Sequence, residues 1–291
     1  MTRTDAEEPV RSIEIAGLRL ACLSADEVVD HMLRALGRGT GGWVITPNVD
    51  YARRAVSDAT VRQLYANASL IVADGVPLLW AARLRGTPLP GRVAGSDLVW
   101  LVAERAAEEG RSIYLLGGNP GSAQRAARSL VARWPRLRIA GFSNPQFSVE
   151  PTADELTAAR AALEESHPDV VYVGLGAPKE ERVIGALRSD FPGMWWIGVG
   201  VSLSFMAGEV ARAPRWMQRA GLEWVHRLLQ EPRRLARRYL IDDLPFTMYL
   251  LIEACGWRVR AFLRPGRAPV LDRSATASPE KPTRDESHRP E

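Results

Sequence analysis

The stretch Leu70-Ile-Val-Ala-Asp74-Gly75-Val76-Pro77 decides the fold. Its apolar residues Leu70–Ala73 predict the end of a buried strand, because turn residues stop the run. Pro77 is suited to the first turn of the helix that follows. In an open parallel sheet, ligands bind beyond the carboxyl ends of the strands, so Asp74 is placed to face a substrate. The alternative is that Asp74 caps the helix Val76–Leu84 and has no chemical role.

The same alternation of an apolar run, turn residues and a helical segment repeats along the chain. The predicted strands are Trp43–Ile45, Leu70–Ala73, Ser112–Leu116, Leu137–Phe142, Asp169–Val173 and Met194–Val199. The predicted helices between them are Val49–Ala66, Pro77–Leu84, Ser96–Glu109, Ser122–Ala132, Thr152–Glu165 and Glu180–Leu187. This order predicts an α/β fold, a Rossmann-like parallel sheet with helices on both faces. The strands would then end at one edge, where we expect Thr46, Asn48, Asp74, Gly117 and Lys179 to converge.

The composition changes toward both ends of the chain. Residues 1–11 are polar, and 264–291 are rich in proline, serine and charge, so both segments are predicted to be disordered. Residues 12–206 are predicted to form the α/β catalytic domain. In 207–263, tryptophans and leucines interleave with arginines and two prolines restart the helices. We call 207–263 the C-terminal appendage and expect a helical unit that packs on, or swings over, the open edge of the sheet and associates with a membrane.

Overall composition is that of a soluble globular protein, with 46% hydrophobic and 25% charged residues in 291. Cys22 and Cys255 lie far apart and the histidines are scattered, which argues against a disulfide scaffold and a zinc site. The start of the chain lacks the apolar core of a signal peptide, and the apolar stretch Leu244–Ile252 is too short to span a bilayer. We therefore expect a cytoplasmic protein.

Positive charge is concentrated in the C-terminal appendage. The net charge is +4, yet Ala211–Tyr239 alone contains eight arginines against Glu223 and Glu231, a local balance of 8 − 2 = +6. Such a stripe indicates an anionic partner, which is phosphate, lipid head groups or nucleic acid. One alternative function is therefore a module that binds nucleic acid or another polyanion.

Two glycine-containing loops suggest phosphate chemistry. Gly117-Gly118-Asn-Pro-Gly121 joins a strand to a helix and is either an anion cradle or a tight turn. It is not GxGxxG, and no acid lies in Leu137–Gly141, which argues against an NAD-type oxidoreductase, the other alternative. Lys179 is one of two lysines in a chain that otherwise uses arginine, so it is either a phosphate contact that needs a compact ammonium or an accidental surface lysine.

A loop arginine and the pattern of acids complete the candidate site. Arg92 precedes a helix and is placed to clamp a diphosphate or a sugar, whereas Asp97 is expected to cap that helix. No Asp-x-Asp pair follows a strand, so we expect no metal and no other cofactor, with cationic side chains and backbone amides neutralising the leaving group.

These motifs together resemble one family. Over residues 10–245, the chain resembles the WecG/TagA/CpsF glycosyltransferases in a series of motifs that occur in the same order. These motifs are Thr46-Pro-Asn48, Ala73-Asp-Gly75, Arg92-Val-Ala-Gly-Ser-Asp-Leu98, Gly174-Leu-Gly-Ala-Pro-Lys-Glu-Glu181, Gly198-Val-Gly200, Arg212-Ala-Pro-Arg-Trp216 and Gly221-Leu-Glu-Trp224 with Arg227-Leu-Leu-Gln-Glu-Pro-Arg-Arg234. The resemblance implies an inverting, metal-independent enzyme of cell-surface polysaccharide synthesis. Its donor would be a UDP-sugar, typically of N-acetylmannosamine, and its acceptor a polyprenyl-diphosphate-linked saccharide at the inner face of the membrane. It also implies an anionic membrane surface as partner, no nucleic acid and a possible homo-oligomer.

The resemblance also assigns roles to residues. Asp74 falls at the position of the catalytic base, with Thr46 and Asn48 beside it in the active site. The substrate-binding positions are Arg92, Gly117, Gly118, Gly176, Lys179, Glu180, Gly200, Ser204, Arg227, Arg234 and Arg237. The last three arginines would close over the donor diphosphate, while Arg215, Arg219, Arg233 and Arg238 would face anionic lipid.

Two positions depart from the pattern of the family. Glu180 stands where the family usually has glutamine, and Ser204 stands where it usually has aspartate. Because both positions line the donor site in the family, the exchange predicts a donor preference different from that of a typical member.

Overall fold

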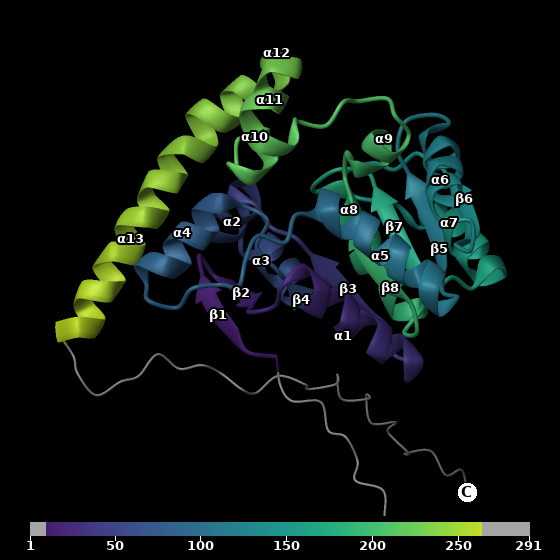
Figure 1. Ribbon diagram of the computed structural model, residues 1–291, viewed down its shortest axis with the longest axis horizontal. Helices are drawn as coiled ribbons and strands as arrows, with labels where there is room; N and C mark the ends of the chain where they lie inside the picture. Colours follow the sequence, from purple (N-terminus) through teal and green to yellow (C-terminus); the bar gives the residue numbers. More distant parts are fainter. Residues whose placement is uncertain (1–9, 264–291) are drawn as a thin grey trace, which may run out of the picture.

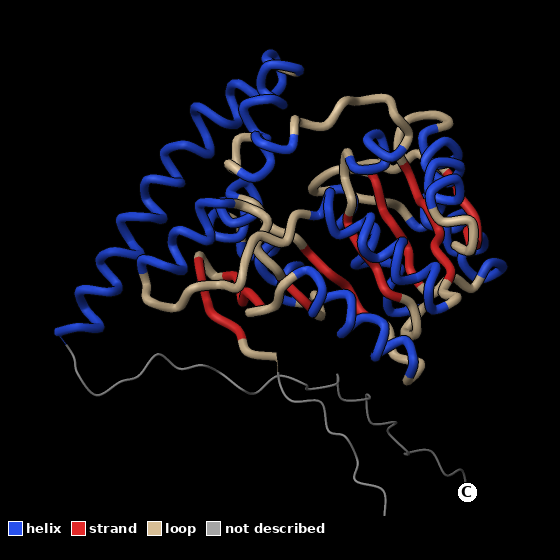
Figure 2. The backbone as a smooth tube through the Cα atoms, viewed as in Figure 1, coloured by secondary structure: helices blue, strands red, loops and turns tan. Residues whose placement is uncertain are grey.

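A six-stranded parallel sheet forms the centre of the molecule, in a computed structural model that describes residues 10–263 (Figures 1 and 2). Its strands are β3 (Gly42–Ile45), β4 (Leu70–Ile71), β5 (Ser112–Gly117), β6 (Arg138–Ser143), β7 (Val170–Gly174) and β8 (Trp195–Gly198). They are arranged in the order β4-β3-β8-β7-β5-β6, and every neighbouring pair is parallel. The predicted Rossmann-like α/β fold is thereby confirmed.

A small antiparallel hairpin precedes the sheet. It pairs β1 (Ser12–Ile15) with β2 (Leu18–Ala21). The carbonyl of Arg11 accepts a 2.8 Å hydrogen bond from the N–H of Cys22 and extends this pairing. The expected disorder of residues 1–11 is therefore wrong at Arg11, while residues 1–9 and the 264–291 tail lie outside the described residues.

Helices cover both faces of the sheet. One face, here called the α4 face, carries α2 (Val49–Ser57), α3 (Ala59–Ala66), α4 (Val76–Leu84), α7 (Ala153–Ser166) and α8 (Lys179–Leu187), the last continued by the short 3₁₀ turn η1 (Arg188–Asp190). The other, the α5 face, carries α1 (Ala25–Gly37), α5 (Gly95–Glu109), α6 (Ser122–Arg133) and α9 (Ser202–Met206). Successive strand residues point to opposite faces, so the buried neighbours Trp195 and Trp196 belong to different cores.

The predicted helix Val49–Ala66 is wrong in one respect, because it is two helices. Asp58 lies between α2 and α3 with an extended backbone (φ −135°, ψ 114°). Its side chain accepts the N–H groups of Thr60 and Val61 and so starts α3 as an N-cap. The restart turns the chain, and α3 packs against both α2 and α8.

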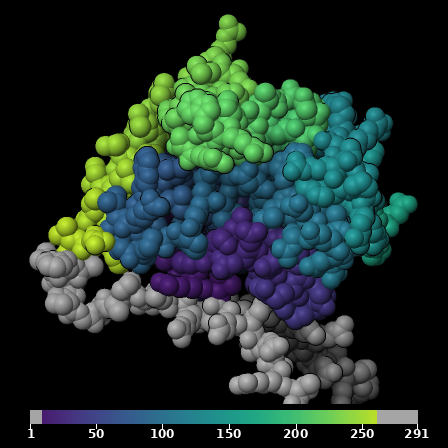
Figure 3. All heavy atoms as spheres, viewed as in Figure 1, coloured from purple at the N-terminus to yellow at the C-terminus, as the bar shows by residue number. Residues whose placement is uncertain are grey.

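The C-terminal appendage consists of α10 (Arg215–Arg219), α11 (Glu223–Gln230), α12 (Pro232–Ala236), the π-helix η2 (Arg237–Asp243) and α13 (Leu244–Leu263). Figure 1 shows α13 lying along α4, and the space-filling view shows the green segment of the appendage across one end of the molecule (Figure 3). Leu250 and Ala254 of α13 are buried in the same core as Leu78 of α4. Part of the appendage therefore shares the core of the α/β domain.

A buried carboxylate ties the appendage to α2. The fully buried side chain of Asp50 contacts Arg53 at 2.6 Å, Arg54 at 2.8 Å and Arg238 of η2 at 3.2 Å. Asp243 of η2 contacts Arg53 at 3.3 Å in return. The expectation that Arg238 faces lipid is therefore wrong, since its guanidinium faces α2.

Candidate active site

Asp74 has separate partners for its backbone and its side chain. Its N–H donates to the carbonyl of Pro47 at 3.0 Å, which fixes the end of β4 against the end of β3. The N-cap of α4 is Gly75, with no side-chain cap hydrogen bond. The capping alternative for Asp74 is therefore wrong. The carboxylate, 29% exposed, is left to face the carboxyl edge of the sheet.

Thr46 and Asn48 lie beside Asp74, because two glycines permit a close approach of the backbone. A Cβ on Gly75 would lie 3.2 Å from Cα of Asn48, and one on Gly95 would lie 2.8 Å from Oγ1 of Thr46. The side chain of Asn48 also caps α2, accepting the N–H of Asp50 at 3.0 Å. The ends of β3 and β4 and the start of α5 thus meet at one place.

A cluster of alternating charges surrounds the carboxylate of Asp74. Arg92 places Nη1 4.0 Å from Asp74 Oδ1 and 3.0 Å from Oε2 of Glu223, the first residue of α11. Arg212, which precedes α10, places Nε 2.9 Å from Glu223 Oε1. Asp97 joins the two arginines from the other side, at 3.8 Å from Arg92 and 2.5 Å from Arg212. The expected capping role of Asp97 is wrong, because the N-cap of α5 is Ala94 and no side chain caps that helix.

The environment of Asp74 makes its carboxyl group more basic than usual. Burial raises the pKa of Asp74 to about 7, and the charges of Glu223 and Asp97 act in the same direction. The guanidinium of Arg92, and to a lesser extent that of Arg212, opposes this rise in pKa. A carboxylate with a pKa near neutrality accepts a proton at physiological pH far better than an ordinary aspartate.

Glu180 is buried at the centre of the same edge, and both of its oxygens have partners within the fold. Oε2 accepts the N–H groups of Gly176 at 3.1 Å and Gly200 at 3.0 Å, which joins the turns after β7 and β8. Oε1 accepts the hydroxyl of Tyr51 at 3.2 Å. Burial, followed by the charge of the neighbouring Glu181, raises the pKa of Glu180 to about 8.

The geometry of this edge agrees with a comparison to known protein families. The model of the glycosyl transferase WecG/TagA/CpsF family matches residues 13–260. The chain belongs to the WecG/TagA/CpsF family. It is therefore a glycosyltransferase of cell-surface polysaccharide synthesis, and the match includes all of the candidate site residues.

In this WecG/TagA/CpsF transferase, the loop at Gly117 and Gly118 is a tight turn with its own anion. Both glycines have positive φ, and a Cβ on Gly117 would lie 2.7 Å from the side chain of Leu175. The carboxylate of Glu209 accepts hydrogen bonds from Ser122 and Arg125 at the start of α6. These hydrogen bonds lower the pKa of Glu209 to about 2. The structure therefore supports the tight-turn alternative for this loop.

The remaining candidates around α8 and α9 have partners inside the transferase. Nζ of Lys179 donates to the carbonyl of Phe147 at 2.8 Å, so the ammonium links α8 to the loop after β6. Ser204, buried in α9, hydrogen-bonds to Glu209 and not to Glu180. Four strand steps separate β4 from β5, which is about 19 Å at ordinary strand spacing. Asp74 and the Gly117 loop accordingly lie in different parts of the edge.

The three arginines expected to close over a diphosphate are not equivalent. Arg227 lies four residues after Glu223 on α11 and so shares the helix face that contacts Arg92. Arg234 is paired with Glu231 at 2.5 Å. Arg237 is exposed at the start of η2. Of the three, Arg227 lies on the helix that also carries Glu223, whereas Arg234 and Arg237 lie further along the appendage.

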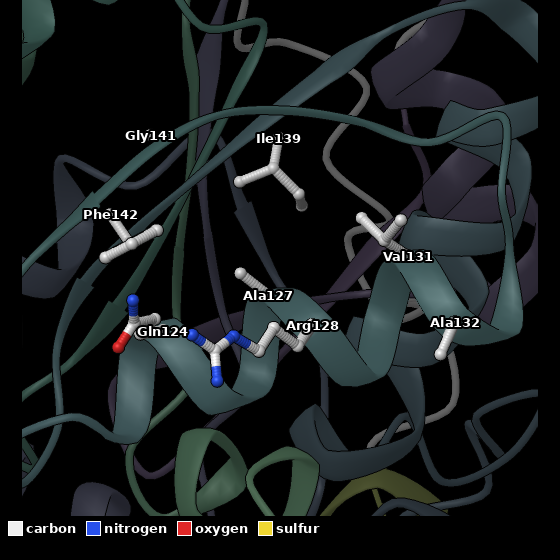
Figure 4. A pocket seen from close by; sticks show the side chains of 8 residues that line it. All are labelled: Gln124, Ala127, Arg128, Val131, Ala132, Ile139, Gly141 and Phe142. Atoms are coloured by element: carbon white, nitrogen blue, oxygen red, sulfur yellow. The ribbon is translucent and has the colours of Figure 1, made fainter.

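An open groove of about 570 Å³ lies between α6 and β6 (Figure 4). Its lining residues are Gln124, Ala127, Arg128, Val131, Ala132, Ile139, Gly141 and Phe142. β6 and β4 are the two edge strands, so this groove lies at the opposite side of the sheet from Asp74. None of the candidate site residues lines it.

Two charged residues of the site, Glu223 and Arg212, carried no role in the sequence analysis. Both lie within the quoted motifs, and Glu223 is one of two acids among eight arginines in Ala211–Tyr239. An acidic residue in so basic a segment was the one feature of the sequence that could have pointed to a role for Glu223 in the site. Within residues 10–263, no group of three or more His, Cys, Asp or Glu side chains is arranged to hold a metal ion.

Proposed function

We propose that this transferase moves a hexose from a UDP-sugar to a polyprenyl-diphosphate-linked saccharide with inversion at the anomeric carbon. The hexose is N-acetylmannosamine or a close relative. The observation that carries the proposal is the Asp74 carboxylate at the end of β4, which caps no helix, has a raised pKa and faces Arg92. Thr46 and Asn48 beside it supply polar groups for orienting a sugar hydroxyl.

In the proposed reaction, Asp74 acts as the general base. Its carboxylate takes the proton from the acceptor hydroxyl while that oxygen attacks the anomeric carbon on the face opposite UDP. The bond between the anomeric carbon and the diphosphate oxygen breaks, and UDP leaves with the electron pair. Base catalysis of this kind contributes roughly 10²–10⁴-fold to the rate.

Charge on the leaving diphosphate needs cations near Asp74. Arg92 supports this role, because its guanidinium lies 4.0 Å from the Asp74 carboxylate. Arg227 supports it as well, being one helical turn from Glu223, which contacts Arg92. We infer that Arg234 and Arg237 join them when substrate is bound, so that arginines serve in place of a metal ion.

Peripheral binding to the inner face of the membrane is part of the proposal. Helix α13 exposes an apolar stripe at helical spacing, formed by Leu244, Met248, Ile252 and Val259. Trp216 of α10 is 65% exposed. Among the described helices, none combines the length and apolarity needed to cross a bilayer. A surface of this kind next to many arginines is suited to lie in an anionic interface.

The direct experiment is a screen of UDP-sugars with a polyprenyl-diphosphate-linked acceptor in vesicles, read as UDP release. We expect release with one UDP-hexose or a few, and only when both substrates are present. Thermal unfolding with UDP or with NAD is the companion measurement, in which UDP should raise the midpoint and NAD should not. Absence of release from every donor together with protection by NAD would contradict the proposal.

A further inference from the structure

Glu223 reaches the candidate site from a distant part of the chain and holds two arginines at once. Its Oε2 lies 3.0 Å from Nη1 of Arg92, and its Oε1 lies 2.9 Å from Nε of Arg212. All three side chains are at most 20% exposed, so little water screens these contacts. Glu223 is the first residue of α11, so the contact exists when that helix is docked on the α/β domain.

One nitrogen of Arg92 faces two carboxylates. Nη1 is 3.0 Å from Glu223 and 4.0 Å from Asp74, so the nearer partner is the residue of the appendage. Without Glu223, the same nitrogen would be available for a direct ion pair with Asp74. We propose that Glu223 is a positioning residue that holds Arg92 back from Asp74 and so keeps the carboxyl group of Asp74 basic while α11 is docked.

The charges around Asp74 support the same role. The charged groups that act on its carboxylate are the cations Arg92 and Arg212 and the anions Glu223 and Asp97. Two cations and two anions balance, so the cluster is neutral when Asp74 is protonated and carries one negative charge when it is ionised. This count favours the proton on Asp74, in the same direction as burial. Removing Glu223 would leave one positive charge in excess and favour the ionised carboxylate.

This inference rests on the proposed function, because the basicity of Asp74 affects the reaction only if Asp74 takes a proton from the acceptor. It adds that the appendage contributes to the basicity of Asp74 as well as to binding. An enzyme whose appendage is undocked would have Asp74 paired with Arg92 and thus a weaker base.

The test is a carboxyl-carbon NMR titration of Asp74 in the full-length protein, assigned with the Asp74→Asn variant. In Glu223→Gln, which keeps the size of the side chain, we expect the Asp74 midpoint to fall by about one pH unit or more. In Arg212→Gln, which removes a cation, the midpoint should rise. Glu231→Gln is the matched control, because it removes an acid from the appendage whose partner is Arg234, and it should leave the midpoint unchanged.

The titration needs no turnover, so it separates this inference from the proposed function. An Asp74 midpoint in folded Glu223→Gln equal to that of the wild type would overturn the inference, whatever the activity. Opposite shifts in the Glu223 and Arg212 variants would support it even if no UDP-sugar proved to be a donor. With an active donor, the acid limb of the pH–rate profile should move with the NMR midpoint. Near-ultraviolet circular dichroism of each variant establishes that the fold is retained.

Discussion

The backbone of Asp74 is held by Pro47 and its side chain faces Arg92, so pH is the simplest probe of the proposed role of its carboxylate as a base. The pKa of Asp74 is raised to about 7, and a general base works in its ionised form. We therefore expect kcat/KM to rise about tenfold per pH unit up to pH 7 and to level off above it. Rates between pH 5 and 8.5, with the unfolding temperature measured in the same buffers, test this. A flat profile over that range would exclude Asp74 as the titrating base.

The buried side chain of Glu180 should affect how the free energy of unfolding depends on pH. Burial and the charge of Glu181 raise the pKa of Glu180 in the folded protein to about 8, above its ordinary value of 4.5. Between these values, unfolding releases a proton, so the free energy of unfolding falls as pH rises, by up to about 1.4 kcal/mol per pH unit. Glu180→Gln removes this proton and should make the decline shallower in urea unfolding between pH 5 and 8. Equal slopes in the variant and the wild type would show that Glu180 keeps an ordinary pKa.

At the scale of elements, the ion cluster around Asp50 joins α2, which begins at Asn48, to η2 of the appendage. Asp50→Asn removes the fully buried partner of Arg53, Arg54 and Arg238. We expect a loss of roughly 2–4 kcal/mol in the free energy of unfolding, near the lower end for a broken buried pair because the arginines remain partly exposed. Asp30→Asn is the matched control. It breaks a pair with Arg105 in which both side chains are about one third exposed, and it should change stability by about 1 kcal/mol or less. Similar losses in both variants would argue against a structural role for the Asp50 cluster.

The apolar stripe of helix α13 is proposed to bind the membrane surface, and substitutions on it test that role. Met248 and Ile252 are both more than half exposed, whereas Leu250 and Ala254 between and beyond them are buried. The double variant Met248→Glu with Ile252→Glu should keep the fold and weaken sedimentation with anionic liposomes by roughly a hundredfold or more. Val131→Glu places one such negative charge on an exposed apolar position of α6 and should bind liposomes normally. Unchanged binding of the double variant would remove α13 from the membrane surface.

At the scale of the whole molecule, the alternation of apolar runs and turn residues predicted the strands, because burial on both faces requires continuous apolar segments. The position of Asp74 followed from the same pattern. The break at Asp58 did not, since an aspartate inside a helical stretch does not reveal whether it caps a new helix. The sharing of a core between α13 and α4 was equally hidden, because an amphipathic helix does not specify which apolar surface it covers.

The candidate site was predictable where its residues follow strands, and not where it depends on distant partners. Thr46 and Asn48 lie near Asp74, but Gly117, which was expected to converge with them, lies about 19 Å away at ordinary strand spacing. Glu223 approaches Arg92 from 131 residues along the chain, and that separation carries no local signal. Glu209, which follows α9, likewise comes from a distant part of the chain. Its carboxylate accepts a hydrogen bond from Ser122 at the start of α6, where an anion cradle would bind its anion.

The proposed role of Asp74 as the base of a glycosyl transfer is tested by replacing its carboxylate with an amide. UDP release is compared between the wild type and Asp74→Asn, with the best UDP-sugar, a polyprenyl-diphosphate-linked acceptor and both proteins at pH 8. Asparagine keeps the size of the side chain and cannot take the proton. We expect a loss of at least about a hundredfold in kcat, with thermal protection by UDP retained. Turnover of folded Asp74→Asn within a few-fold of the wild type would contradict it.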